Sequence, residues 1–574
     1  MAETLLSPGV LARENDQSFI QGQPLERGAA IIGPAVKGPV EIPTLVGSFS
    51  EYTAIFGGAV ESGSNVYSYL TSIAANNYFQ NGGTSLLVTR VVSGSFTSAV
   101  SSLIPTGSGG PTTGLSPFVL ETISEGIIMN STSTEISGAL ASGSSDNVRW
   151  EIPTVNTASG TFSLLIRRGD DNNVQKIVLE SYNNLSLDPY ASNYISKVIG
   201  DVNFNLVNDG SDYYIQQSGS YSNISKYVRV KQVNFNTPKY FDNNGNAKAA
   251  FTGSLPAVSS GSFGSAVGSN IPVGRAANYY NTINGTDSQG LVGADYNNAI
   301  ALLSNVDEYK YNVLSVPGLL STTHATQVNA VVNNTIGRGD SIAIVDLVAY
   351  GSQINAVINQ AAAFDSSYAA TYWPWLQTID PNNGEAVWVP ASTMLPGVYA
   401  FTDASSDPWF APAGITRGGL GQVIRAERKL TASNRDDLYE ANVNPIATFP
   451  GTGVTVFGQK TLQKRASALD RVNVRRLLIA LKSYIGQVAD GLVFEQNTAA
   501  TRNNFLSQVN PYLESVQQRQ GLYAFKVVMD ETNNGPDVVD RNELVGQIFL
   551  QPTRTAEFII LDFNVLPTGA TFPA

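Results

Sequence analysis

The sequence predicts a multidomain protein of the α/β and α+β classes. We expect a mixed-sheet core flanked by helices, a C-terminal α/β module and a β-rich inserted outer domain. Three observations support this prediction. Short apolar runs alternate with helical patterns, which indicates strands buried on both faces of a parallel sheet. Between residues 96 and 274, apolar and polar residues alternate instead, as in half-buried strands. Two amphipathic helical patterns lie near the C-terminus, at residues 474–488 and 505–516.

The composition fits a folded, loop-rich protein. Of 574 residues, 43% are hydrophobic and only 14% are charged, and 52 are glycine, whereas disordered chains combine high charge with low hydrophobicity. The net charge of −12 argues against general nucleic-acid binding by this chain, because such binding would need a local basic stripe. The chain has no apolar run of about eighteen residues, so we expect no membrane insertion. Met1–Thr4 has no basic region of the kind that opens a secretory signal.

The residue types present exclude most catalytic chemistry. The chain has no cysteine and one histidine, His324, which we expect to be a surface or helix-capping residue. Asp403 and Asp407 are interpreted as solvated carboxylates of a turn. The glycines at 451, 453 and 458 do not have the spacing of a dinucleotide loop and predict a turn. We therefore expect no enzyme activity, no catalytic or metal site and no cofactor.

The core domain is predicted at residues 26–95 plus 275–425. Ala29–Gly33 is a buried strand, and Ser48 has the capping-box spacing that opens a short helix. Five further elements share the apolar patterns of an α/β sheet, and we expect their strands to pair with those near Ile31 and Val88. These elements are a helix at 66–79, a strand at 85–92, a strand at 313–316, a helix at 325–336 and a strand at 341–346.

The β-rich region at residues 96–274 is predicted to be an insertion in this core. Stretches rich in Ser, Thr and Gly at 93–116 and 252–269 have the composition of linkers. Strands are expected between them at 150–153, 161–168, 174–180 and 213–217.

Residues 426–562 are predicted to form the C-terminal domain. After the two helices we expect a strand at 522–529, a turn, and strands at 544–550 and 556–563. Pro552 is assigned to the connection because proline donates no ladder hydrogen bond. The alternating residues after Leu561 include Phe563, Val565 and Leu566, and they predict a terminal strand in an arm at 563–574.

One segment is basic although the chain is acidic. Its cations are opposed by Asp470 alone, which leaves two interpretations: a solvated helix face or a docking face for an acidic partner. Three of the cations, at 471, 475 and 482, fall near one helix face by their spacing. The cations are Lys460, Lys464, Arg465, Arg471, Arg475, Arg476 and Lys482.

Several short sequence motifs occur in an order typical of one family. They are Asp407–Gly414, Asn444–Ile446, Gly451–Leu462, Phe494–Asn497 and Pro552–Ile559. In this order they resemble the C-terminal part of contractile tail sheath proteins of bacteriophages and related injection machines. The resemblance extends over residues 1–92 and 294–565 and is only patchy between them.

The resemblance implies a structural function. Such proteins stack as hexameric rings around a tail tube, as a helical assembly, and contract to drive the tube through the host cell envelope. It also implies an N-terminal arm at 1–25, with Pro8, Gly9, Val10, Phe19 and Ile20, that joins the C-terminal arm in linking neighbouring subunits by strand addition. The basic segment would then face the tube.

The expected partners are other copies of this chain, the tail tube protein, and baseplate and tail terminator proteins. The expected location is the virion tail, after assembly in the host cytoplasm. The sheath of a bacteriocin or secretion-type injection system is an alternative. A surface-layer or adhesin-like coat protein and a hydrolase that uses Asp403 and Asp407 are competing hypotheses from other classes.

Overall fold

The computed structural model describes residues 28–62, 65–111, 114–132, 135–136, 138–210, 212–269, 283, 287–557 and 559. The chain divides into two units, Arg27–Ile479 and a second unit formed by Ala480–Ala574 with Met1–Glu26. The predicted arm residues Pro8, Gly9, Val10, Phe19, Ile20, Phe563, Val565 and Leu566 lie outside the described residues.

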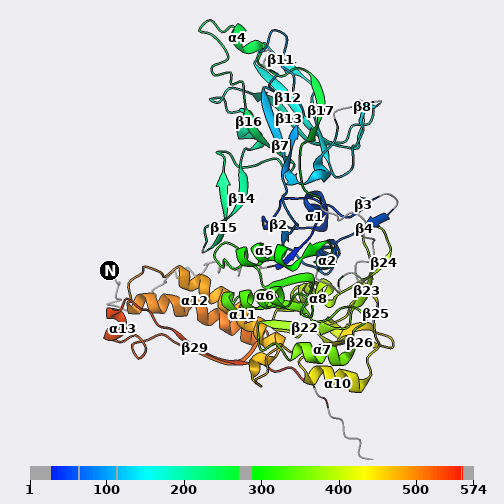
Figure 1. Cartoon of the computed structure of the whole chain (residues 1–574). Helices are drawn as coiled ribbons and strands as arrows, with labels where there is room; N and C mark the ends of the chain where they lie inside the picture. Colours follow the sequence, from blue (N-terminus) through cyan, green and yellow to red (C-terminus); the bar gives the residue numbers. More distant parts are fainter. Residues whose placement is uncertain are drawn as a thin grey trace, which may run out of the picture. The chain divides into compact units, whose positions relative to one another are not determined.

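The first unit is built on an eight-stranded mixed sheet (Figure 1). Its six inner strands pair in parallel, and an antiparallel strand closes each end. In spatial order the strands are β2 (Thr44–Val46), β5 (Leu86–Arg90), β1 (Ala29–Gly33), β20 (Val313–Leu320), β21 (Ile342–Asp346), β22 (Ala369–Trp373), β26 (Asn444–Phe449) and β27 (Gly453–Val456). The predicted sharing of one parallel sheet by the strands near Ile31, Val88 and Val313 is confirmed.

Both faces of this sheet are buried, as the unbroken apolar runs predicted. Along β1, Ile31 packs into one core and Ile32 into the other, because successive side chains point to opposite faces. The first core includes residues of α1 (Phe49–Phe56), α2 (Leu70–Gln80) and α8 (Ala391–Ser405). The second includes residues of α5 (Asn297–Leu302), α6 (Ala325–Arg338), α7 (Ile354–Ala361) and α10 (Ala432–Glu440).

Smaller elements complete the central part of this unit. Ser48 caps α1 as predicted, since its hydroxyl accepts the Glu51 N–H at 3.1 Å. The remaining elements are the hairpins β3 (Val60–Ser62)–β4 (Asn65–Tyr67) and β18 (Asp287–Ser288)–β19 (Leu291–Val292), the sheet β24 (Ala386–Val389)–β23 (Leu376–Ile379)–β25 (Val423–Ala426), helix α9 (Gly414–Arg417), and the 3-10 turns η3 (Gly293–Tyr296) and η4 (Ala468–Asp470).

The insertion forms its own antiparallel sheet over a separate core that includes Phe118, Trp150 and Phe162. Its main strands are β11 (Val155–Asn156), β12 (Thr161–Arg168), β10 (Val148–Ile152), β17 (Ser259–Gly264), β6 (Ser98–Ser101), β7 (Phe118–Glu125) and β16 (Val228–Val233), and β13 (Val178–Ser186) pairs with β12. Its smaller elements are η1 (Ile127–Met129), β8 (Glu135–Ile136), β9 (Ala139–Leu140), α3 (Ile195–Ile199), β14 (Asn203–Asn208), β15 (Tyr213–Ser218) and α4 (Ala249–Thr252).

The interpretation of the two Ser- and Gly-rich stretches as linkers was wrong. They contain β6 and β17, which pair with each other in the middle of the insertion sheet. Gly261 of β17 lies against Trp150, and a Cβ atom there would be only 2.6 Å from the indole. The small residues that suggested a linker therefore make room for a core tryptophan.

The insertion also contacts the central part of this unit at several points. It is therefore held more tightly against the central sheet than a domain attached only through flexible linkers would be. The buried Arg90 at the end of β5 donates to the Glu125 carbonyl at the end of β7, at 3.1 Å. The hairpin β14–β15 packs Leu206, Tyr213 and Ile215 against the core on the α5 side. Figure 1 shows this hairpin between the insertion sheet and α5.

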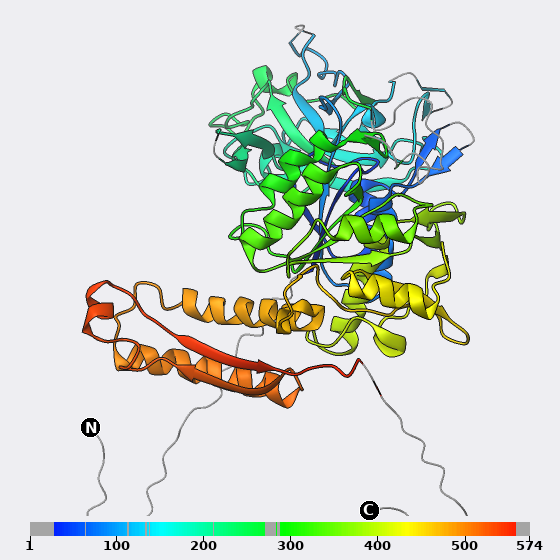
Figure 2. The same ribbon diagram turned by 60° about the horizontal axis from the view of Figure 1, so that its bottom comes forward.

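The second unit contains most of two helices and one hairpin (Figure 2). Helix α11 (Val472–Asp490) begins in the first unit and ends in the second, and it is followed by α12 (Ala499–Gln518), β28 (Leu522–Val528), α13 (Pro536–Asp540) and β29 (Gln547–Pro552). The predicted order helix, helix, strand, turn, strand agrees with α11, α12, β28 and β29, although the connection predicted as a turn contains α13. Of the last predicted strand, at 556–563, residues 556, 557 and 559 are not in a strand, and the others lie outside the described residues. Pro552 is an exception, because it pairs opposite Leu522 as the last residue of β29 instead of lying in a connection.

Two further expectations are corrected. The predicted domain boundary at 425/426 cuts the central sheet, because β26 and β27 continue it to Val456. His324 precedes α6 at the capping position but is only 3% exposed, so it is not a surface residue. Its Nδ1 lies 2.8 Å from the Thr323 hydroxyl.

Candidate assembly interface

The basic segment does not form one cationic face. Arg475 and Arg476, at the start of α11, are 4% and 3% exposed. Arg476 donates to both carboxylate oxygens of Asp403 at 2.6 and 2.7 Å and stacks on the ring of Tyr399. The prediction that these two guanidinium groups face a partner is therefore wrong, since the first unit buries them itself.

The ring of Tyr368 covers Arg475, with the guanidinium carbon 4.0 Å from the ring centroid. The Nη2 of Arg475 also donates a hydrogen bond to the Ser367 hydroxyl. Burial lowers the pKa of Arg475 below its usual value, because the charged form loses hydration. A buried guanidinium held by rings and hydroxyls fixes the start of α11 against the central domain.

Lys460 and Arg471 are held on one tyrosine. The Lys460 ammonium donates to the carbonyl of Tyr439 at 2.6 Å and lies 4.5 Å from the centroid of its ring. Arg471 contacts the same ring at 5.9 Å and pairs with Asp470 at 3.1 Å. Arg471 also lies outside the helix, which begins at Val472, so the helical spacing predicted from 471 to 482 does not apply.

Three cations of the segment remain exposed, namely Lys464, Arg465 and Lys482. The Lys464 ammonium donates to the Ala362 carbonyl at 2.7 Å at the surface. Of the seven predicted residues, these three are the ones that a partner can reach.

The sequence analysis did not identify the partner of Arg476. Asp403 lies in the last turn of α8 and not in a solvated turn. Spacing along the chain gave no signal for the pair, because α8 and α11 are more than sixty residues apart. Gly451 has a positive φ in the turn between β26 and β27, as predicted, whereas Gly453, also with positive φ, is the first residue of β27, and Gly458 lies in the connection after that strand.

The ends of the parallel strands hold a buried carboxylate. Asp346 ends β21 and accepts the Ser392 N–H at 3.1 Å, and the Ser392 hydroxyl contacts its other oxygen. Burial raises the pKa of Asp346 to about 7. The cavity beside it has a volume of about 10 Å³, which is room for about one water molecule. This position commonly binds ligands in α/β sheets, but here it is filled by side chains that include Trp373 and Trp375.

The hairpin β28–β29 is a candidate contact for other chains. Among the described residues, its two strands pair only with each other, which leaves both outer edges with free backbone groups. Tyr523 and Phe549 on it are 64% and 57% exposed. Residues of α12 support it: Val509, Leu513 and Val516 are buried in this unit.

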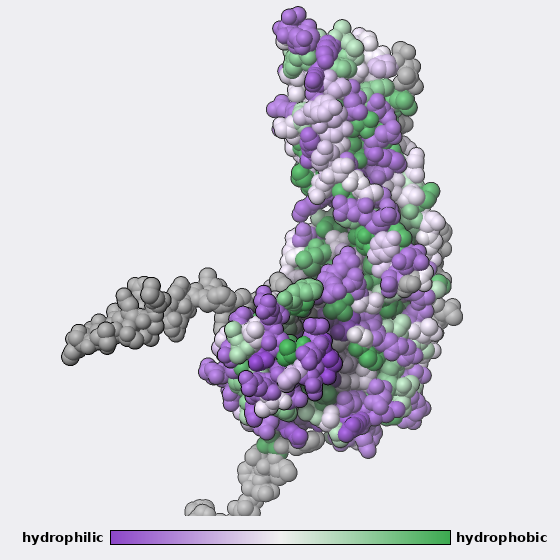
Figure 3. Space-filling model, turned by 90° about the vertical axis from the view of Figure 1, so that its left-hand side faces the viewer, coloured by the Kyte–Doolittle hydropathy of each residue, from purple (hydrophilic) through white to green (hydrophobic). Residues whose placement is uncertain are grey.

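The surface seen in Figure 3 mixes hydrophilic and hydrophobic residues.

Among the described residues, no group of three or more acidic or histidine side chains has a metal-binding arrangement. None of the described helices combines the length and hydropathy that crossing a membrane requires.

Two family models match this chain. The phage tail sheath protein central domain matches residues 289–462, and the phage tail sheath C-terminal domain matches residues 465–566. The division between the two models, at residues 462–465, lies before α11, whereas the structure changes from one unit to the other within this helix, after Ile479.

The chain is also similar to curated tail sheath proteins. It is 30% identical over 415 residues to that of Vibrio phage KVP40, a match that covers 65% of this chain and 61% of the relative. It is 36% identical over 230 residues to that of Enterobacteria phage T4, covering 40% of this chain and 35% of the relative. The matched part of the chain thus spans about three fifths of the length of the Vibrio phage KVP40 protein and about a third of that of the Enterobacteria phage T4 protein.

The fold has a counterpart in the crystal structure of a sheath tail protein from Listeria innocua. The match covers 93% of this chain and 96% of that chain, with a TM-score of 0.52 and 10% identity. This likeness shows a shared fold. The two matched domain models and the phage relatives show that the chain belongs to the contractile tail sheath family.

Proposed function

We propose that this chain polymerises as stacked hexameric rings around a tail tube and contracts to drive the tube through the envelope of a target cell. Its role is structural, and it catalyses no reaction. It acts in the virion tail after assembly in the host cytoplasm, and its partners are further copies of itself, the tube protein, and baseplate and tail terminator proteins. The curated relatives described above come from phages, which favours a phage sheath over a bacteriocin or secretion-system sheath.

The observation that carries this proposal is the exposed hairpin β28–β29. A two-stranded ribbon needs further packing to be stable in water, and α12 packs against β28, but the outer edges of this ribbon remain a template for pairing with another chain. In the proposed assembly, strands from the arms of neighbouring copies cover these edges, a mode known as β-addition. The arms are residues 1–25 and 563–574.

The strength of one such link is modest. Each net backbone hydrogen bond contributes about 0.5–1.5 kcal/mol, so an arm that makes about five bonds contributes several kcal/mol. Repetition around each ring and along the stack makes assembly cooperative, and in this proposal the arms keep neighbours connected while subunits move.

Truncation tests this step. Removing Met1–Gln23, or everything after Asp562, should leave a folded monomer with an unchanged melting temperature that no longer polymerises. Sedimentation and electron microscopy measure the outcome. Sheaths of normal length from either truncated chain would contradict the strand-addition proposal.

We also propose that the exposed cations Lys464, Arg465 and Lys482 face an acidic surface of the tube. Such a contact is partly solvated and therefore screened within about 8–10 Å at physiological salt. Changing all three to Glu should leave the subunit folded but prevent growth on purified tubes. The matched control changes Lys310, Arg428 and Lys429, which are also exposed cations, to Glu. Equal growth of both triple variants would show that the basic segment has no role in docking.

The insertion, residues 96–274, is proposed to lie farthest from the tube axis. Its sheet has its own core, so this part of the chain can carry a separate function without altering the ring contacts.

A further inference from the structure

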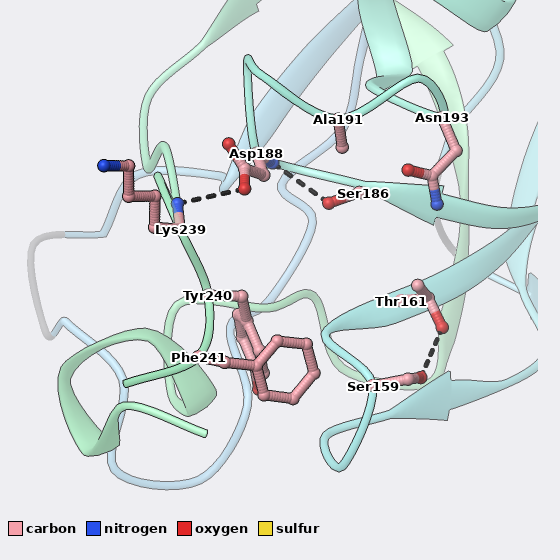
Figure 4. A pocket seen from close by; sticks show the side chains of 9 residues that line it. All are labelled: Ser159, Thr161, Ser186, Asp188, Ala191, Asn193, Lys239, Tyr240 and Phe241. Carbon is pink, nitrogen blue, oxygen red and sulfur yellow. Dashed lines mark hydrogen bonds between the residues drawn. The ribbon is translucent and has the colours of Figure 1, made fainter. Parts of the chain in front are cut away.

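The insertion contains an open cavity of about 390 Å³ (Figure 4). Its lining comes from three segments that are far apart in the sequence: the β11–β12 turn, the end of β13 with the loop after it, and the segment after β16. This volume lies at the low end of the range of small-ligand sites, which suits a ligand of one or two rings.

One wall of the cavity is polar and held in place by backbone contacts. The Asp188 carboxylate accepts the N–H of Lys239 and that of Tyr190, both at 3.0 Å. The Asp188 N–H in turn donates to the Ser186 hydroxyl at 3.1 Å. Asn193, from the same loop, points its amide toward the cavity in Figure 4. These groups are therefore oriented before any ligand binds.

The backbone at Lys239 is strained. Its φ is +48°, in the left-handed region that a residue with a side chain adopts at a cost. Strain of this kind persists only where the surroundings impose it, and it concentrates at ligand sites. This conformation of Lys239 directs its backbone N–H to the Asp188 carboxylate. It also places the next two residues, Tyr240 and Phe241, in the cavity lining.

The opposite wall is aromatic. Tyr240 is 4% exposed, its hydroxyl donates to the Thr157 carbonyl at 2.7 Å, and its ring lies so close to Gly160 that a Cβ atom there would meet it at 2.6 Å. Phe241 packs edge-on against Tyr240 and is 44% exposed. One aromatic ring is thus fixed, and the other stays open at the cavity mouth.

Hydroxyl groups complete the site. Ser159 and Thr161 bond each other at 2.7 Å and line the cavity between the aromatic and polar walls. A hydroxyl both donates and accepts, and a carboxylate only accepts. The polar side chains of this lining therefore match a ligand that carries hydrogen-bond donors and acceptors at many positions.

We propose that this cavity binds a neutral saccharide, whose hydroxyls meet Asp188, Asn193 and Thr161 and whose apolar ring face lies on Phe241. Aromatic surfaces combined with a few convergent polar groups are typical of small-ligand sites. The lining contains one cationic side chain, Lys239, and one anionic side chain, Asp188, so its formal charges balance and the site does not select a phosphate or another anion.

The test uses the purified full chain and defined sugars. Saturation-transfer NMR with maltose, lactose, chitobiose and mannobiose, followed by titration calorimetry, should detect at least one binder. Phe241→Ala should weaken that binding by about tenfold, the size of one aromatic contact. Ala191→Trp, which fills the cavity, should abolish it.

Phe204→Ala is the matched control, since Phe204 of β14 is 43% exposed and lies outside the cavity lining. It should leave binding unchanged, and the melting temperatures of all three variants should show that they fold. The proposal is overturned if none of the four sugars binds, if inorganic phosphate binds in their place, or if the Phe241 and Phe204 variants bind a sugar equally well.

Discussion

Replacing Asp346 with asparagine should reduce the pH dependence of stability of the central domain. The carboxyl is fully buried at the end of β21, and its pKa rises from 3.8 to about 7 because the charged form is deprived of water. Between these values the folded chain binds more protons than the unfolded chain. The stability contributed by the neutral carboxyl is therefore fully present below about pH 4 and is lost as the pH rises through about 7.

The size of the effect follows from the shift. About three pKa units correspond to about 4 kcal/mol between the two ends of this range. Asparagine resembles the protonated acid, since its oxygen can accept the Ser392 N–H and its amide can donate to the Ser392 hydroxyl. The variant should therefore keep the fold and gain relative stability at high pH.

Urea unfolding followed by tryptophan fluorescence measures this, because Trp373 and Trp375 line the small cavity beside Asp346. The parent chain should lose stability from about pH 4 to about pH 8, and Asp346→Asn should lose much less. Asp307→Asn, a change at an exposed residue, is the control. Infrared spectroscopy should show a protonated carboxyl that titrates near neutral pH and is absent from Asp346→Asn. Equal pH profiles for the parent and the Asp346 variant would refute the reasoning.

Two further predictions concern contacts described above. Arg476→Met should destabilise the first unit by about 2–4 kcal/mol in chemical unfolding, because it removes the two charge-assisted hydrogen bonds from the buried guanidinium to the Asp403 carboxylate. Arg465→Glu, an exposed change, should stay within about 0.5 kcal/mol of the parent, and equal losses in the two variants would contradict the assignment. Replacing Leu206 and Ile215 together with Ser should release the β14–β15 hairpin from the core on the α5 side. Hydrogen exchange should then accelerate at residues 203–218 and not at Phe118–Glu125; unchanged exchange in the hairpin would show that this packing does not hold it.

The central sheet could be predicted from the sequence because its strands are buried on both faces. Ala29–Gly33 is an unbroken run of apolar and small residues, and Leu86–Arg90 begins with three apolar residues in succession; such runs beside helices are typical of a buried parallel sheet. Strand β26 was expected in the C-terminal domain because Asn444–Ile446 is one of the motifs that resemble the C-terminal part of sheath proteins. It joins β22 in parallel at Tyr372 and Trp373 all the same.

The site residues could be predicted less well. Helical spacing identifies which cations share a face, but it does not say whether that face is buried. Arg475 and Arg476 became interior residues because Tyr368, Tyr399 and Asp403 come from distant parts of the chain to meet them. The lining of the saccharide cavity was missed for the same reason, since its three segments meet only in the folded insertion.

The order of strands in the central sheet also constrains how the chain folds during synthesis. Strand β1 lies between β5 and β20, yet the whole insertion is translated between Arg90 and Val313. At roughly 5–20 residues per second, the ribosome takes on the order of 10–40 s to supply the second neighbour of β1. During that interval, the edge of β1 that β20 later covers stays open, while the insertion can already close its own core. The insertion can therefore fold before the central sheet is complete, and slower elongation leaves the open edge of β1 exposed for longer.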